Sequence, residues 1–336
     1  MFGRKSRLLT SAAFAAGLFA SAAWAADVKP AVIYDLGGKF DKSFNEGVFN
    51  GATKFSKETG VAFRDLEIQN EAQREQVLRK FAKDGFSPII MPGFAWETAL
   101  KKIAPEFPNT KFAIIDDVVD LPNVQSMVFK AEEGSFLVGV IAAKTSKTGK
   151  VGFVGGMDIP LISAFGCGYA QGVKYASGGK TEVIANMTGT TPAAWNDPVK
   201  GGELAKSQID RGADIVYAAA GATGQGVLKA AADAGKFGIG VDSNQNGLFP
   251  GKILTSMLKR VDVATYDSFM DAKKGTWKAG VQVFGLKNDG VGYAVDDNNK
   301  AILSAEAKAA AEAAKADIIS GKIQVHDYMS DNKCPA

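Results

Sequence analysis

The feature that most constrains the fold is a regular alternation of short apolar runs with amphipathic stretches. β-rich apolar runs occur at 28–36, 61–68, 88–92 and 111–116, and segments with helical spacing separate them at 43–57, 71–83 and 96–103. Strands that alternate with helices predict a parallel sheet covered on both faces, because each parallel connection must cross over the sheet. The first third of the chain is therefore expected to form a doubly wound α/β unit.

The same pattern then restarts, which predicts a second unit of similar architecture. A strand at 124–129 and a helix at 132–144 lead into strands at 151–155, 182–187, 214–219 and 237–241, with helices at 160–175, 202–211 and 224–234 between them. Each half opens with a strand that is expected to end in a glycine pair, at 37–38 and at 155–156. The sequence thus predicts two doubly wound lobes with parallel sheets.

The order of elements changes after residue 241, which indicates that the chain crosses between the lobes. Strands are predicted at 252–258, 291–295 and 323–328, and helices at 263–273 and 304–320. Crossings near Lys130, Lys259 and Asp289 would form a multi-strand hinge. The predicted lobes are 26–130 with about 260–290, and 131–259 with about 291–336. Open α/β sheets bind ligands at the carboxyl ends of their strands, so a cleft that closes on a small molecule is expected there.

The N-terminus predicts secretion. Arg4, Lys5 and Arg7 precede an apolar run at 8–20 and the small-x-small sequence of Ala23 to Ala25, the pattern of a signal peptide cleaved near Ala25. The apolar run is too short to span a bilayer, and no lipidation cysteine follows it. Cleavage would remove three cations from a chain of formal net charge +3, which leaves no basic excess to attract nucleic acid or anionic membranes. We expect a free periplasmic protein.

Cysteine and histidine usage bounds the chemistry. An oxidising compartment permits a disulfide between Cys167 and Cys334, and two free thiols remain the alternative because sequence cannot show that the positions meet. His326 is the single histidine and lies in a predicted strand without a nucleophile motif nearby. Triads and zinc sites depend on histidine near other functional groups. We therefore expect a binding protein without catalytic residues, metal or cofactor.

Aromatic and polar side chains follow the predicted strand ends in both halves, where they would line the cleft. A flat ligand would stack on an aromatic face from each lobe, at about 1–3 kcal/mol per base, and a ribose diol would bind an acid with an amine nearby. Helix packing of Phe44, lobe packing of Trp195 and solvation of Lys259 are the alternative interpretations. The candidate positions are Phe44, Asn45, Phe94, Asp116, Trp195, Asp242 and Lys259. Gly221 is a further candidate, because it opens a tight turn between a predicted strand and helix whose backbone would line the cleft.

Several segments then resemble one family in the right order along nearly the whole mature chain. Residues 34–47, YDLGGKFDKSFNEG, resemble the opening motif of the basic membrane protein (BMP) family, the PnrA-like substrate-binding proteins of ABC transporters. Further resemblances are 129–139 (FKAEEGSFLVG), 150–157 (KVGFVGGM), 165–172 (FGCGYAQG), 240–243 (GVDS) and 256–261 (SMLKRV).

The resemblance implies a type I periplasmic-binding fold that captures a purine nucleoside for an ABC permease in the inner membrane. It implies that Phe44 stacks on one face of the base and that Asp242 and Lys259 hold the ribose. Asn45 and Asp116 would contact the base edge or the rim, and Asp35 at the end of the first strand is a further ligand-binding candidate. The expected ligands are adenosine, guanosine or inosine, and the receptor is expected to be a monomer.

Two departures from the family pattern leave the ligand open. The chain lacks the lipidation cysteine of many members, and Trp195 stands where a phenylalanine is expected as the second stacking residue. A larger indole could fill part of the ribose space, which raises a free purine base such as adenine as an alternative ligand. The same fold could also bind a sugar or a flavin, and an enzyme that acts on nucleosides is a less favoured hypothesis.

Overall fold

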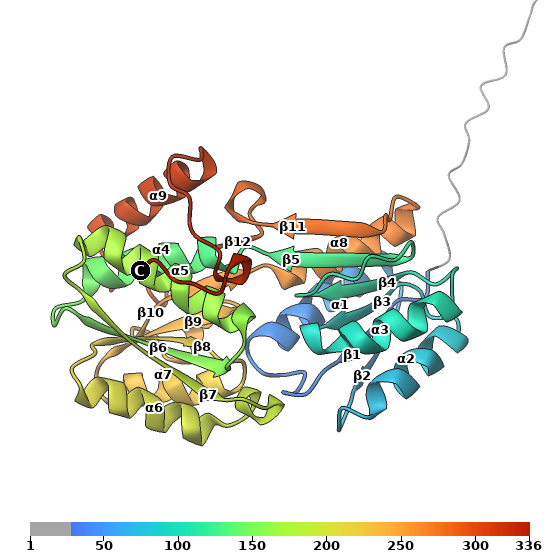
Figure 1. The fold of residues 1–336 in the computed structure, drawn as a ribbon, viewed down its shortest axis with the longest axis horizontal. Helices are drawn as coiled ribbons and strands as arrows, with labels where there is room; N and C mark the ends of the chain where they lie inside the picture. The colour runs from blue at the N-terminus through green and yellow to red at the C-terminus, as the bar shows by residue number, and fades with distance from the viewer. Residues whose placement is uncertain (1–27) are drawn as a thin grey trace, which may run out of the picture.

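The protein contains two six-stranded sheets, and the computed structural model describes residues 28–336 (Figure 1). The first sheet is parallel throughout, and in the second only the pairing of β10 with β12 is antiparallel. The first sheet has the order β11 (Gly280–Phe284), β5 (Val124–Phe129), β4 (Phe112–Ile115), β3 (Ile89–Pro92), β1 (Ala31–Tyr34), β2 (Arg64–Glu67). The second has the order β12 (Val291–Tyr293), β10 (Ile253–Lys259), β9 (Phe237–Asp242), β8 (Ile215–Ala219), β6 (Lys150–Met157), β7 (Glu182–Gly189).

Helices cover both faces of each sheet, and each sheet with its helices is called a lobe below. The N-terminal lobe carries α1 (Phe44–Thr59), α2 (Gln73–Lys83), α3 (Glu97–Ile103) and α8 (Val261–Lys274). The C-terminal lobe carries α4 (Ala131–Thr145), α5 (Pro160–Ser177), α6 (Pro198–Asp210), α7 (Thr223–Asp233) and α9 (Ala305–Ile319). The two doubly wound units predicted from the strand–helix alternation are confirmed.

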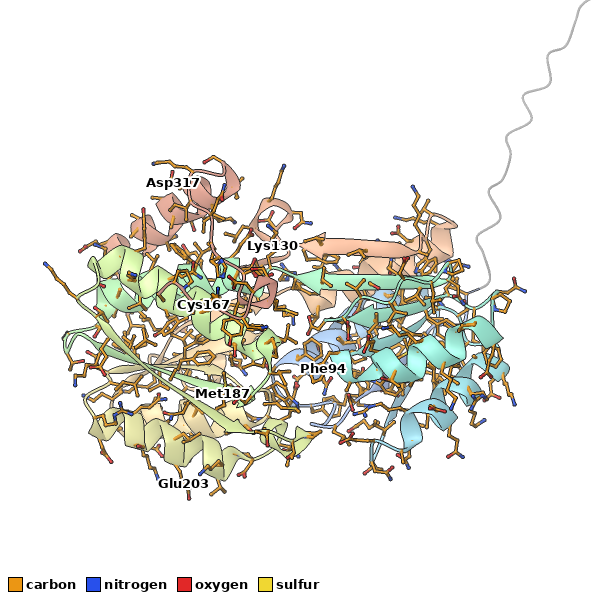
Figure 2. The ribbon with its side chains drawn as sticks, in the orientation of Figure 1. Phe94, Lys130, Cys167, Met187, Glu203 and Asp317 are labelled. Carbon is orange, nitrogen blue, oxygen red and sulfur yellow. A yellow bond between two sulfur atoms is a disulfide. The ribbon has the colours of Figure 1, made fainter. Side chains whose placement is uncertain are left out.

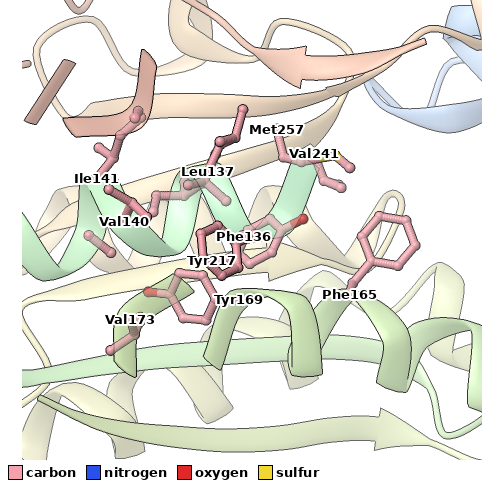
Figure 3. Packing of buried hydrophobic residues seen from close by; sticks show 14 of the residues in the cluster. Phe136, Leu137, Val140, Ile141, Phe165, Tyr169, Val173, Tyr217, Val241 and Met257 are labelled. Atoms are coloured by element: carbon pink, nitrogen blue, oxygen red, sulfur yellow. The ribbon is translucent and has the colours of Figure 1, made fainter. Parts of the chain in front are cut away.

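Alternating residues of the central strands explain why these segments are apolar without interruption. Ala31 and Ile33 of β1 pack under α2 and α3, whereas Val32 and Tyr34 pack under α1 and α8. Successive strand residues point to opposite faces, so a strand covered on both faces must be apolar at every position. The same rule shapes β8, whose Tyr217 joins a core under α4 and α5 that Figure 3 shows.

The chain passes between the lobes three times, after β5, after β10 and after β11. Figure 1 shows β5 and β11 side by side along the edge of the N-terminal lobe that leads to the other lobe. The backbone N–H of Lys130 donates to Phe284 O at 2.8 Å, and the N–H of Arg260 donates to Gly290 O at 2.9 Å. These bonds tie the crossings to one another at one side of the interface between the lobes, which makes this side the natural hinge.

The sequence missed β11 because an edge strand lacks the signal of a buried one. Its five residues are exposed or half-buried, with Val281 and Val283 facing solvent, so no continuous apolar run marks it. The predicted strand at 323–328 is wrong. The backbone N–H and C=O of His326 instead bond the side chain of Gln171 at 2.9 Å each, and a short 3-10 helix, Tyr328–Ser330, follows.

The C-terminal tail is also fixed by a disulfide. Cys167 of α5 and Cys334 are joined, with their Cα atoms 5.6 Å apart (Figure 2 labels Cys167). Where the sequence allowed either a disulfide or two free thiols, the structure has the disulfide. Because α5 also carries Phe165 of the cavity described below, the disulfide attaches the tail to an element of the site.

The glycine pairs do not end the strands as predicted. Tyr34 is the last residue of β1, three positions before Gly37, and β6 continues through Gly155 and Gly156 to Met157. Gly155 and Gly156 leave no room for a Cβ atom, because neighbouring side chains pack directly against the strand. A methyl group on Gly155 would lie 2.3 Å from Met187 Sδ, and one on Gly156 would lie 2.3 Å from Trp195 Cζ3.

Within residues 28–336, no helix is long and apolar enough to cross a membrane. The predicted signal peptide, residues 1–25, lies outside the described residues.

A buried acid stands beside the hinge. Glu132 follows the first crossing and is 7% exposed. Burial, together with the charges of Asp327 and Glu133, raises the pKa of Glu132 to about 8. A carboxyl with a raised folded-state pKa stays protonated in the folded protein after it has ionised in the unfolded chain. Its contribution therefore lowers stability as pH rises from about 4.5 to about 8.

We predict that Glu132→Gln flattens this part of the pH dependence, because glutamine mimics the protonated acid and cannot ionise. At pH 5 the variant and the wild type should unfold with similar free energies. At pH 9 the variant should be more stable by roughly 2–4 kcal/mol. Urea unfolding at both pH values measures the difference, and Glu306→Gln, an exposed acid on α9, is the control. An equal shift at both pH values would contradict a buried, protonated Glu132.

Candidate ligand-binding site

A cavity of about 110 Å³ lies between the lobes, at the carboxyl ends of the central strands. A single buried water needs roughly 10–15 Å³ on this measure, so the cavity has room for a small molecule. All nine residues predicted from the sequence line it: Asp35, Phe44, Asn45, Phe94, Asp116, Trp195, Gly221, Asp242 and Lys259. The fold places all of these residues around one cavity. Their contact with a ligand stays a prediction.

Aromatic side chains reach the cavity from both lobes. Phe44 is the first residue of α1, and Phe94 begins the short 3-10 helix after β3 and lies between the lobes in Figure 2. Trp195 ends a 3-10 helix after β7, and Phe165 comes from α5 (Figure 3). Two lobes that each supply an aromatic ring can hold a flat ligand between them.

Trp195 owes its position to two glycines. Its indole lies against Gly156 of β6, where any Cβ would collide with the ring, and its backbone lies beside Gly221, which has φ +55° at the turn before α7. Gly37 meets it from the N-terminal lobe, because a methyl group there would lie 3.6 Å from Trp195 Cβ. The indole therefore lies on the strand itself.

A buried ammonium group that lines the cavity joins the two lobes. Lys259 Nζ lies 2.5 Å from Asp116 Oδ2, and the side chains are 3% and 7% exposed. The same ammonium lies 4.8 Å from the ring centroid of Phe44 and 5.5 Å from that of Phe165. Aromatic faces attract a cation and keep water away from it. The sequence placed Lys259 beside Asp242, and the structure pairs it with Asp116.

Asp242 binds the opposite lobe in a different way. Its Oδ2 accepts a hydrogen bond from Ser43 Oγ at 2.5 Å, across the interface. Burial raises the pKa of Asp242, and the charge of Lys259 and the Ser43 bond oppose that rise. Asp116 and Asp242 have φ values of +72° and +62°, a conformation uncommon outside glycine that aspartate tolerates better than most residues. Asp116 follows β4, and Asp242 is the last residue of β9, which holds the corresponding place in the second sheet. The duplicated fold therefore places an acid from each lobe at the cleft.

The loop before α1 is held by side chains of the C-terminal lobe. Gln225 Nε2 donates to Asp41 O at 3.2 Å, Gln245 Nε2 donates to Lys42 O at 2.9 Å, and Ser243 Oγ donates to Ser43 O at 2.7 Å. These bonds satisfy backbone oxygens of one lobe with donors from the other. The described conformation is thus one in which the cleft is closed.

Asp41 organises the start of α1. Its carboxylate accepts backbone N–H bonds from Ser43, Asn45 and Glu46 at 2.8, 3.0 and 3.1 Å. Burial raises the pKa of Asp41 to about 7 against these stabilising bonds. The orphan N–H groups of a helix start require such an acceptor. Phe44 and Asn45 are thereby positioned at the cavity.

Sequence reasoning missed Arg74 and Phe165. Arg74 is on α2, where a charged residue in a polar helix ordinarily faces water, but here its side chain is 11% exposed and lines the cavity. Its Nη2 lies 2.8 Å from Asp35 Oδ1. Within residues 28–336 no cluster of three or more metal-ligating side chains occurs, and His326 is on the C-terminal tail.

Two α/β lobes, three crossings and a cavity lined from both sides define a two-lobed small-molecule-binding protein. Residues 28–328 match the model of the family described as ABC transporter substrate-binding protein PnrA-like. The chain belongs to this family, and the expected class of fold is confirmed.

Individual relatives are consistent with this membership. An ABC transporter nucleoside-binding protein BmpA of Lactococcus lactis is 31% identical, with 89% of each chain covered. An uncharacterized lipoprotein of Pyrococcus horikoshii is 34% identical over 79% of this chain and 68% of its own length. The crystal structure of a solute-binding protein of an ABC transporter system from Aeropyrum pernix superposes with a TM-score of 0.82 at 30% identity, covering 89% of this chain and 93% of that one.

We predict that Lys259→Met lowers the free energy of unfolding by about 3 kcal/mol, because it leaves Asp116 buried without a cation. Lys229→Met is the matched control, since Lys229 pairs with Asp233 at 2.7 Å on the solvent side of α7 and should contribute less than about 1 kcal/mol. The double variant Lys259→Met/Asp116→Asn should recover part of the loss. Urea unfolding measures all of these. A cost for Lys259→Met no larger than the control's would mean that the lobes open and water solvates Asp116.

Proposed function

We propose that the protein captures a purine nucleoside or a free purine base between its lobes and delivers it to an ABC permease in the inner membrane. The observation that carries this proposal is the set of groups around one cavity. Phe44 and Trp195 supply an aromatic face from each lobe, and Asp116, Asp242 and Lys259 supply two acids with an amine. Aromatic faces suit a base, and acids beside an amine suit a ribose.

The proposal includes the lobe division and the location expected from the sequence. Residues 26–130 with about 260–290 would move against 131–259 with about 291–336, about the three crossings. The protein would act as a monomeric receptor in the periplasm after cleavage near Ala25. It would bind its ligand without changing it chemically, in keeping with its membership of a substrate-binding family.

The existing contacts of the cavity side chains support the free base as an alternative to the nucleoside. The indole of Trp195 occupies the space beside Gly156, and Lys259 and Asp242 already have partners in Asp116 and Ser43. A ribose would have to compete for these groups.

We predict submicromolar binding of one member of a panel of adenosine, guanosine, inosine and adenine. The protein is unfolded, dialysed and refolded first, because a tight ligand can survive purification and mask its own site. Isothermal titration then measures each affinity, with a sugar and a flavin as controls for the other ligand classes. Adenine bound more tightly than adenosine would place the indole in the ribose space. Binding of the sugar or flavin alone would contradict the proposal.

A further inference from the structure

Two residues that line the cavity from the N-terminal lobe each have a side-chain oxygen atom without a hydrogen bond to the described residues. The first is Oδ2 of Asp35, for which the described residues offer no hydrogen-bond donor. The other oxygen, Oδ1, accepts from the backbone N–H of Leu36 and from Arg74 Nη2, both at 2.8 Å. Oδ2 lies beside Gly93, another cavity residue, since a methyl group there would lie 3.8 Å from it. Asp35 therefore presents a free acceptor.

The second oxygen belongs to Asn45. Its Nδ2 donates to the carbonyl oxygen of Gly38 at 3.0 Å, and a carbonyl can only accept, so the amide nitrogen must face that way. Its Oδ1 consequently points elsewhere and bonds none of the residues that the structure describes. Asn45 lines the same cavity and is 5% exposed. This part of the cavity thus offers two acceptors whose orientation is set by neighbouring groups.

Arg74 is what orients the first acceptor. Its guanidinium reaches Asp35 with Nη2 and Glu71 with Nη1, at 2.8 and 3.3 Å, and lies 6.0 Å from the ring centroid of Trp96. Its Nε is buried without a hydrogen-bond partner among the described residues. The planar guanidinium is therefore held by the acids and the indole. Together with the N–H of Leu36, it fixes which oxygen of Asp35 is left for a ligand.

We propose that Arg74 is a positioning residue for ligand selectivity. By occupying Asp35 Oδ1 it directs Oδ2, with Asn45 Oδ1, toward hydrogen-bond donors, so the site selects purines with an exocyclic amino group over 6-oxopurines that lack one. This inference rests on the proposed purine-binding function. Adenine and guanine carry NH₂ donors, whereas hypoxanthine places a carbonyl oxygen at position 6. A ligand carbonyl oxygen placed against the oxygens of Asp35 and Asn45 would leave all of these acceptors without a hydrogen bond. Polar sites reject ligands of nearly the same shape in this way.

The test compares matched ligand pairs on the refolded protein by isothermal titration. The pairs are adenine with hypoxanthine and adenosine with inosine, which covers both the base and the nucleoside. The wild type should bind the amino member at least about tenfold more tightly. Arg74→Met keeps the apolar stem and should reduce that ratio to about threefold or less, chiefly through weaker binding of the amino member. Arg74→Lys should retain an intermediate ratio, because an ammonium keeps the charge without the fork.

Arg79→Met is the matched control, since Arg79 also lies on α2 and binds an acid, Glu106, but faces solvent away from the cavity. Its selectivity ratio should equal that of the wild type. Because both ligands of a pair are measured on the same sample, a partly unfolded variant lowers the active fraction without changing the ratio. Equal affinities for both ligands of a pair in the wild type, or an unchanged ratio in Arg74→Met, would overturn the role of Arg74 in selectivity but leave the proposed function standing. No binding of any purine would overturn the proposed function as well.

Discussion

The ion pair between Lys259 and Asp116 is the interaction on which the closed cleft depends. Each charge comes from a different lobe, and both are almost completely buried. Removing two charges from water costs several kcal/mol per ion, which their attraction offsets only when they meet in good geometry. Open lobes would separate the partners and let water reach both, so closure and pairing are one event. A ligand that interacts with either group acts directly on the equilibrium between the open and closed forms.

The duplicated architecture explains why the chemistry gathers in this place. Parallel strands of both sheets deliver their carboxyl ends to the same interface, and Asp116 and Asp242 leave corresponding strands in the same left-handed backbone conformation. The crossings then bring β10, and Lys259 at its end, to these acids. Helix starts complete the cavity, because Asp41 caps α1 and so sets the positions of Phe44 and Asn45. The site is thus assembled by the topology of two simple lobes.

The sequence predicts the features of the fold and the site that depend on local pattern, and it misses those that depend on tertiary contacts. Buried strands such as Ala31–Tyr34 are apolar throughout, and the strand-end positions of the nine cavity residues follow from the order of strands and helices. The sequence did not predict strand β11, because an edge strand is exposed and lacks a continuous apolar run. The C-terminal tail was wrongly predicted as a strand, because the side chain of Gln171 and the disulfide hold it in place of strand pairing. The sequence did not predict Arg74 as a cavity residue, because only tertiary packing turns a charged helix residue toward a cavity.

A crystal structure of the refolded protein with the tightest-binding purine tests the central claim most directly, because it locates the ligand. We expect the purine ring between Phe44 and Trp195, with the lobes closed and Lys259 paired with Asp116. Density for the purine outside this cavity, or inside it without contact to either ring, would contradict the account.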